Sequence, residues 1–216
     1  MVVTVASQLT SLPASSQTPI ALGSSAELLS ALLRAVSHDS KSPLLTLSLS
    51  AELLAEAPSV ERAGIARAGL TNGVRELERM LDAVTMLSRA LNRPLDARAT
   101  PLVEFVGAAA NGSGQTHVMV DPRPLTDLIE LLTVAGSPLS VHHTAHHAEL
   151  AATLPVECAD LETSPLQALF GSLQRHAGGT VGRLAAAQVQ LERCGAQVSV
   201  AGGQLRIRVP LAPEAR

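Results

Sequence analysis

Aromatic residues are almost absent from this sequence. The 216 residues include no tryptophan or tyrosine and only two phenylalanines, Phe105 and Phe170. Proteins that bind nucleic acids commonly stack bases on aromatic side chains and neutralise phosphates with clustered lysine and arginine. This chain has few stacking groups, a net charge of −3 and a pI near 6.2. A nucleic acid is therefore not an expected partner.

Long apolar runs and paired cysteines are also lacking. A membrane-spanning helix needs about 20 consecutive apolar residues, and the sequence contains no such run. The N-terminal segment lacks the charged start and apolar block of a secretory signal, so we expect a cytoplasmic protein that does not bind membranes. Two cysteines do not make a disulfide framework, and the acidic neighbours of Cys158 would raise its thiol pKa and weaken it as a nucleophile.

The residues that are abundant favour helices in the first half of the chain. Alanine, leucine and valine supply most of the 46% apolar content, and residues 1–23 are predicted to be a poorly ordered leader. Ser24-Ser25-Ala26-Glu27 has the spacing of a helix-capping box, so a helix is predicted from there to Glu56. Pro58 ends it, and a second helix is predicted over Val60–Leu91, whose apolar stripe includes Ile65 and Leu81.

This pattern predicts an α+β protein with two domains. The hairpin of residues 24–92 would bury its apolar stripes against a second copy, which makes a dimeric four-helix bundle. A linker over residues 93–101 would lead to an α/β sandwich over residues 102–216. Its predicted helices are 101–110, 122–135, 164–176 and 180–194, and its predicted strands are 117–120, one or two strands within 139–154, 197–200 and 204–210.

A single histidine stands in a polar segment of the first predicted helix. At about 100° per residue, His38 falls opposite the apolar side of that helix and should face water. Ser42 lies four residues on and shares the outward face, whereas Asp39 follows His38 directly. The apolar side is formed by Leu29, Leu32, Leu33, Val36, Pro43 and Leu47.

The neighbours of His38 suit phosphoryl chemistry. One neutral ring nitrogen can attack phosphorus while Asp39 accepts the proton on the other nitrogen. Lys41, the only lysine, could offset phosphoryl charge, and the Ser42 hydroxyl could orient a water during dephosphorylation. Pro43 removes the amide that would bond to the Asp39 carbonyl, so a bend is expected there. The spacing alone also fits an ordinary exposed histidine on an amphipathic helix.

The residue pattern around His38 is more specific than its spacing. Ser37-His38-Asp39-Ser40-Lys41-Ser42-Pro43-Leu44, followed by Ala51-Glu52-Leu53-Leu54, resembles the H-box of sensor histidine kinases. That family reads Ser-His-Glu/Asp-x-Arg/Lys-Thr/Ser/Asn-Pro-Leu, and every defined position is matched. The resemblance implies that His38 is phosphorylated, that Asp39 is its acid/base partner, and that Asp39 and Ser42 form a phosphatase pair. It also implies an ATP-binding α/β sandwich after the hairpin.

The C-terminal half departs from that family in the residues that bind ATP. Val118–Leu125 looks like the strand-to-helix entry of the sandwich, but the helix lacks the family's asparagines, and no asparagine follows Asn111. The family's Asp-x-Gly-x-Gly motif is absent, because Gly171 is the only glycine between residues 137 and 177. The resemblance therefore implies a degenerate ATPase-like domain of the histidine phosphotransferase type.

Three other features have both a functional and a structural interpretation. The turn Gly178-Gly179 could hold phosphate at a helix N-terminus or only shape the chain. Glu130 could replace a metal-binding asparagine or lie in solvent. The run His142–His147 could bind zinc, nickel or copper, although strand geometry converges at most a pair of its imidazoles. The structural interpretation is favoured in each case, and no resident metal or cofactor is predicted.

The leading hypothesis is a histidine phosphotransferase that shuttles a phosphoryl group between the aspartates of response-regulator receiver domains. His38 would carry the group without ATP, and the receiver would supply magnesium. Leu45 and Leu49, on the His38 side of the helix, are expected to form part of the receiver-binding surface. Two alternatives stay open: a divergent histidine kinase that autophosphorylates His38 from ATP, and a non-catalytic dimeric scaffold.

Overall fold

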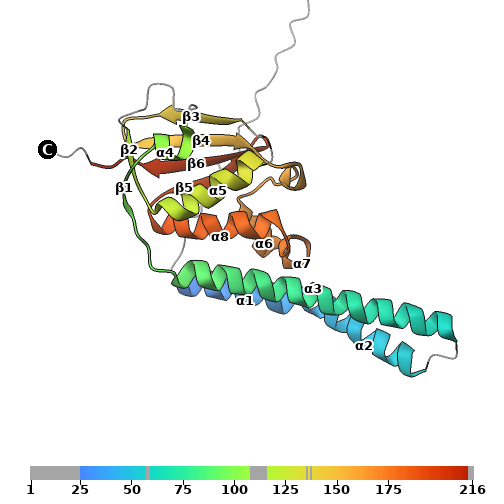
Figure 1. The fold of residues 1–216 in the computed structure, drawn as a ribbon. Coiled ribbons are helices and arrows are strands. Elements are labelled where there is room, and N and C mark those ends of the chain that lie inside the picture. The colour runs from blue at the N-terminus through green and yellow to red at the C-terminus, as the bar shows by residue number, and fades with distance from the viewer. Residues whose placement is uncertain (1–24, 57–58, 108–115, 135, 137, 214–216) are drawn as a thin grey trace, which may run out of the picture.

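The computed structural model describes residues 25–56, 59–107, 116–134, 136 and 138–213. The structure is α+β, with a long helical arm and an α/β part beside it (Figure 1). The predicted leader, and Ser24 of the predicted capping box, lie outside the described residues. The arm consists of α1 (Ser25–Asp39), α2 (Lys41–Ala55) and α3 (Val60–Asn92).

The first two helices are almost one helix, interrupted at Ser40. Pro43 has no N–H to donate to the Asp39 carbonyl, so the α-helical ladder is broken at that point, as predicted. The flanking bonds persist, because the Ser40 N–H donates to the Val36 carbonyl at 3.0 Å and the Leu44 N–H donates to the Ser40 carbonyl at 3.1 Å. The chain therefore bends directly after His38 and continues in the same general direction.

Small residues bring α2 and α3 together. Ala66 and Gly73 of α3 are buried, and a Cβ added to Gly73 would lie 2.7 Å from Leu47 Cγ. Close approach of two helices requires such small side chains at the contact. The larger apolar residues of the predicted stripe, such as Ile65 and Leu81, are 61% and 62% exposed in the single chain.

The α/β part contains two antiparallel sheets. The strand β1 (Arg98–Pro101) pairs with β2 (His117–Val120), and a four-stranded sheet has the order β3-β4-β6-β5. The strands of the larger sheet are β3 (Leu139–His143), β4 (His147–Thr153), β5 (Gln197–Ala201) and β6 (Gln204–Pro210). The helices are α4 (Val103–Val106), α5 (Pro122–Val134), α6 (Pro165–Gly171), α7 (Leu173–His176) and α8 (Thr180–Arg193), with a 3-10 turn at Val156–Cys158.

One face of the larger sheet is covered by α5 and α8 (Figure 1). Leu205, Ile207 and Val209 of β6 are buried, and the residues between them point to the opposite face, which is the period of two expected for a strand. Each buried leucine contributes about 1.5–3 kcal/mol through the hydrophobic effect. The helical side of this core includes Leu125, Leu128, Leu132, Leu184 and Leu191.

The linker and two predicted helices differ from expectation. Arg98–Pro101, placed in the linker, is a strand because it pairs with β2. The helix predicted over 101–110 is found only as α4, with residues 108–110 outside the described part. The helix predicted over 164–176 is broken at Ser172, which is extended (φ −160°, ψ 94°) and caps α7 by accepting the Arg175 N–H. Gly171 and Ser172 together explain the break, because they suit a helix end and a new N-cap.

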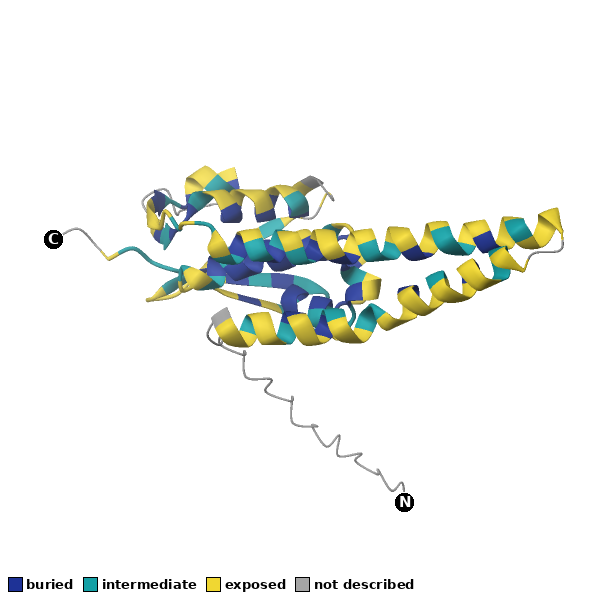
Figure 2. Ribbon diagram, turned by 90° about the horizontal axis from the view of Figure 1, so that it is seen from below, coloured by how far each residue is buried: buried dark blue, intermediate teal, exposed yellow. Residues whose placement is uncertain are grey.

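A second hydrophobic core joins the arm to the α/β part (Figure 2). It buries one side of α1 and of the C-terminal half of α3 against α6, α7 and α8. Part of the apolar surface that we expected a second copy to cover is thus covered within the chain, and the dimeric four-helix bundle stays a prediction. The buried residues of this core are Leu32, Ala35, Met80, Ala83, Leu87, Ala90, Leu166, Leu169, Leu173, Ala177, Ala185, Ala186 and Val189.

Candidate functional site

His38 lies in the last turn of α1 and points into solvent. Its side chain is 83% exposed, as the helical periodicity predicts. On the same helix Leu32 and Ala35 are buried against the α/β part, whereas Leu29 and Leu33, expected on the buried side, are 45% and 68% exposed. The helix therefore presents an accessible imidazole on a firmly packed backbone.

Asp39 binds the imidazole of His38 directly. Nδ1 of His38 lies 2.7 Å from Oδ1 of Asp39, whose side chain is only 11% exposed. An ionised carboxylate can only accept hydrogen bonds, so Nδ1 is the donor. In the neutral ring the lone pair then resides on Nε2, and Nε2 is the nitrogen able to attack an electrophile.

The second oxygen of Asp39 is held by the α/β part. The Gln174 main-chain N–H, in the first turn of α7, donates to Oδ2 of Asp39 at 3.1 Å. Burial alone would raise the pKa of Asp39, but hydrogen bonds from His38 and from the amides of Gln174 and Leu173 outweigh it and lower the pKa. Asp39 is therefore ionised at neutral pH, in the orientation that fixes the His38 ring.

Lys41 and Ser42 lie in the first turn of α2, and both are exposed. Among the described residues, neither side chain enters the hydrogen bonds that connect His38, Asp39 and Gln174. The carbonyl of Ser42 accepts a hydrogen bond from the Thr46 hydroxyl at 3.1 Å. The roles expected for Lys41 and Ser42 in charge neutralisation and dephosphorylation stay predictions.

Gln174 was missed from the sequence, and so was its link to α3. Its side chain donates to Oε2 of Glu76 at 3.1 Å, while its main chain holds Asp39. The Gly171-Ser172 pair was the available signal, because it marks the start of a new helix whose first amides are free to bind a carboxylate. The carboxylate that binds there belongs to Asp39, 135 residues away along the chain. The tertiary fold alone brings it to this helix.

The entry to α5 is organised by Asp121 for a structural purpose. Its buried carboxylate accepts the Arg123 N–H and the Asp96 N–H, both at 3.1 Å, and so ties the segment after α3 to the start of α5. Asp127 and Glu130 on α5 are exposed. The solvated interpretation of Glu130 is therefore the better one.

The glycine turn before α8 already has an anionic partner within the chain. Gly179 adopts φ +86°, and the hydroxyl of Thr180, at the first position of α8, donates to Oε2 of Glu157 at 2.6 Å. A carboxylate beside this helix start would repel a phosphate. The structural interpretation of the turn is therefore favoured.

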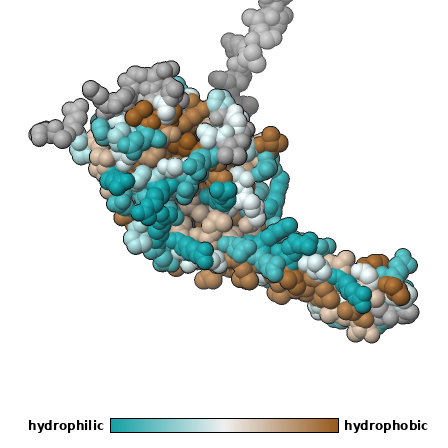
Figure 3. Space-filling view, viewed as in Figure 1, coloured by the Kyte–Doolittle hydropathy of each residue, from teal (hydrophilic) through white to brown (hydrophobic). Residues whose placement is uncertain are grey.

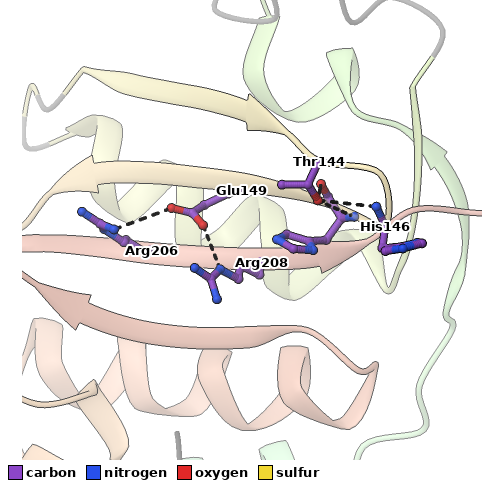
Figure 4. A network of polar contacts seen from close by, with 6 residues as sticks. Thr144, His146, Glu149, Arg206 and Arg208 are labelled. Carbon is purple, nitrogen blue, oxygen red and sulfur yellow. Dashed lines mark hydrogen bonds and ion pairs between the residues drawn. The ribbon is translucent and has the colours of Figure 1, made fainter. Parts of the chain in front are cut away.

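The histidine run closes a β-hairpin. The Thr144 hydroxyl accepts the N–H groups of His146 and His147 and donates to the His147 carbonyl (Figure 4). The run was expected to lie on one strand, but His142 and His143 end β3, His147 begins β4, and a turn separates His142 from His146. Within the part of the chain that the structure describes, no group of three or more histidine, cysteine, aspartate or glutamate side chains could hold a metal ion.

Charged side chains on the open face of the sheet pair with one another (Figure 4). Glu149 of β4 accepts from Nε of Arg208 at 2.8 Å and lies 3.9 Å from Arg206, both on β6. The Arg208 hydrogen bond is the main reason that the pKa of Glu149 is lowered, although burial opposes it. These pairs join neighbouring strands and are typical of a stabilising cross-strand contact.

Cys158 is buried, and its thiol is unreactive. Burial, followed by the charges of Glu157 and Asp160, raises its pKa to about 11. At neutral pH it is therefore a neutral thiol, as the acidic neighbours predict.

None of the helices in the described ranges is long and apolar enough to span a bilayer.

Comparisons with known proteins find similarity only among solved structures. No known family and no curated protein matches the sequence. The histidine kinase AdeS of Acinetobacter baumannii is 12% identical, with a TM-score of 0.38 over 82% of this chain and 98% of AdeS. Full-length ShkA, solved in complex with AMPPNP, is 14% identical, with a TM-score of 0.38 over 88% of this chain and 47% of ShkA. A bacterial phosphotransferase is 14% identical, with a TM-score of 0.38 over 88% of this chain and 98% of its own.

Proposed function

We propose that this chain is a histidine phosphotransferase of a two-component phosphorelay. The observation that carries the proposal is the state of His38, which is 83% exposed while Asp39 binds its Nδ1 at 2.7 Å. A nucleophile that serves two large partners must be reachable, because the reacting atoms have to approach within about 3–3.5 Å. The match of residues 37–44 to the H-box pattern supports the same chemistry.

The proposed step is a transfer from a receiver aspartyl phosphate to His38. The lone pair of Nε2 forms a bond to phosphorus, and the bond from phosphorus to the aspartyl oxygen breaks, with its electrons staying on the released carboxylate. The proton on Nδ1 stays in place, and the carboxylate of Asp39 stabilises the positive charge that develops on the ring. The reverse step, with the aspartate of a second receiver as the acceptor, completes the relay.

Lys41 and Ser42 are proposed to act once a receiver is bound. The Lys41 ammonium, on the exposed first turn of α2, would offset charge on the transferring phosphoryl group. The Ser42 hydroxyl, with Asp39, would orient a water when the phosphoryl group is hydrolysed instead of transferred. These two side chains tune the fate of the phosphoryl group, whereas His38 carries it.

The residues of the C-terminal part favour a transfer without ATP. The exposed positions of α5 include Asp127 and Glu130, and this helix contains no asparagine. Two carboxylates here would repel the phosphates of a nucleotide. We propose that magnesium enters with the receiver, whose acidic pocket binds it, and that this chain holds no cofactor of its own.

The arm offers the surfaces that the proposal needs. Leu45 and Leu49 are 60% and 55% exposed on α2, within three turns of His38, and fit a receiver-binding surface. Hydrophobic side chains gather along the lower edge of the arm (Figure 3). The exposed large apolar residues of the arm include Leu33, Ile65 and Leu81. We propose that this edge pairs with a second copy in a homodimer, and that the protein works in the cytoplasm beside its receivers.

The proposal is tested by following the phosphoryl group from a receiver. Receiver domains from the organism that encodes this chain are charged with radiolabelled acetyl phosphate, freed of the reagent and mixed with the chain. We expect acid-labile, alkali-stable label on the wild type and none on His38→Gln. His142→Gln is the matched control, because this histidine is also exposed but lies on β3.

Each alternative gives a different result in this assay or in a parallel one with γ-labelled ATP. Equal label on His38→Gln and wild type would refute the role of His38. Release of inorganic phosphate without any label on the chain would indicate a phosphatase and contradict the relay. Stable labelling of His38 from γ-labelled ATP would favour the divergent kinase, and receiver binding with neither label nor phosphate release would favour the scaffold.

A further inference from the structure

The α/β part reaches the reactive histidine through one short helix. The break at Ser172 starts α7 beside the last turn of α1, and this places the first amides of α7 against Asp39. Asp39 therefore has two partners, one from each half of the chain. His38 occupies Oδ1 at 2.7 Å, and the Gln174 N–H occupies Oδ2 at 3.1 Å.

The interface between the α/β part and the arm is held by hydrogen bonds at both of its ends. Beside the site, the Gln174 side chain donates to Glu76 of α3 at 3.1 Å. At the far end, the Arg193 guanidinium donates to the carbonyls of Ala90 and Arg93 at 2.8 and 3.0 Å, at the C-terminus of α3. The buried leucines and alanines between these points hold α6, α7 and α8 against the arm.

We infer that the main-chain N–H of Gln174 is a positioning group for His38. It fixes the carboxylate of Asp39, and the carboxylate fixes the proton on Nδ1, so that Nε2 is the nitrogen presented to a receiver. The part of this inference that concerns transfer rests on the proposed function. The part that concerns the ring of His38 applies to the unphosphorylated protein and stands independently.

The physical reason is that a carboxylate on a short flexible side chain seldom holds one orientation in water. An aspartate beside a histidine in the sequence can rotate away, and the neutral ring can then carry its proton on either nitrogen. A second hydrogen bond to the other oxygen removes that freedom, as outer groups do for a histidine that binds a metal. The lowered pKa of Asp39 agrees with this, because the amides stabilise its charged form.

The α/β part thereby has a role in phosphotransfer that requires no nucleotide. Its helices would form the outer wall of the phosphotransfer site, and separation of the two halves would release Asp39. Transfer would then slow although His38 itself stayed in place. The α/β part would thus control the rate of phosphotransfer through His38 of the same chain.

The decisive variant removes the amide and leaves the side chains of His38 and Asp39 intact. Gln174→Pro deletes the N–H, and a first helical turn tolerates proline because its amides have no partner within the helix. The ring ¹⁵N shifts of His38 are measured at about two pH units above the ordinary histidine pKa of about 6.5. We expect the wild type to carry the proton on Nδ1, and Gln174→Pro to shift it toward Nε2 and slow transfer at least about tenfold.

The control is a proline in another first turn. Arg62→Pro deletes an amide that donates to the Ser59 hydroxyl at 3.3 Å, at the far end of the arm. We expect it to leave the His38 ring and the transfer rate unchanged. A folded Gln174→Pro variant with the wild-type ring signal and rate would overturn the inference.

A second pair of variants decides the matter if Gln174→Pro does not fold. Glu76→Ala removes the acceptor of the Gln174 side chain, whereas Glu76→Gln keeps an oxygen there. We expect the alanine variant to shift the His38 proton and slow transfer, and the glutamine variant to restore both. Wild-type behaviour of Glu76→Ala would then overturn the inference. A normal ring signal without any transfer in the wild type would instead refute only the proposed function.

Discussion

A methyl group added at Gly73 tests whether the close contact between α2 and α3 sets the geometry beyond His38. Gly73 is buried in the middle of α3, and an added Cβ would lie 2.7 Å from Leu47 Cγ, 2.9 Å from its Cδ2 and 3.1 Å from the carbonyl oxygen of Pro43. The leucine side chain can move, but the carbonyl belongs to the backbone of α2. The helix must therefore shift near the segment that carries His38.

Two opposing effects set the magnitude. Replacing glycine by alanine within a helix stabilises it by about 1 kcal/mol, and overpacking a tight contact costs about 1–3 kcal/mol. Gly64→Ala is the matched control, because it lies on the same helix, is exposed and has no atom within 4 Å of the added Cβ. We expect Gly64→Ala to be more stable than wild type by about 1 kcal/mol, and Gly73→Ala to be less stable than Gly64→Ala by about 1–3 kcal/mol.

Thermal unfolding of the three proteins at one concentration measures this difference. For a chain of this size, 1 kcal/mol corresponds to about 2–4 °C in Tm, so the two variants should differ by about 2–12 °C. We also expect Gly73→Ala, unlike Gly64→Ala, to slow phosphotransfer. Equal stabilisation by both substitutions would refute the argument that α2 lies in close contact with α3 at this point.

Two further predictions concern ionisable groups. Because the pKa of Asp39 is lowered below its ordinary value of 3.8, its contribution to stability is present above that value and is lost as the pH falls through the lowered pKa. Urea unfolding at about pH 5 and about pH 3 should show a larger loss of stability for wild type than for Asp39→Asn, and equal losses would contradict the lowered pKa. Cys158, with a pKa of about 11, should resist alkylation by iodoacetamide near neutral pH in the folded chain. It should react once urea unfolds the protein, and fast labelling of the native state would disprove its burial.

The sequence predicted the exposed histidine well because helical periodicity and a local motif decide it. His38, Asp39 and Pro43 are close neighbours in the chain, so their spacing defines which side faces water and where the helix is interrupted. The element order was also largely predictable, since α3, α5 and α8 differ by at most one residue at either end from the predicted helices.

The sequence did not predict contacts that depend on distant pairing. Arg98–Pro101 has little strand pattern of its own and becomes a strand because β2 lies beside it. The buried side of α3 is formed by small residues such as Ala66 and Gly73, whereas hydrophobicity alone favoured Ile65 and Leu81. The Gln174 contact with Asp39 depends on the packing of α7 against α1, which no local pattern records.

The length of α3 has a mechanical consequence. Its 33 residues span about 50 Å at about 1.5 Å per residue, and the α/β part holds it by the hydrogen bond to Glu76 and by the buried residues from Met80 to Ala90. Toward its N-terminus α3 continues as a rod that packs against α2. A small rotation of α3 where the α/β part holds it would therefore become a large displacement at the tip near Val60. A force applied at that tip would exert a torque on the contact beside His38.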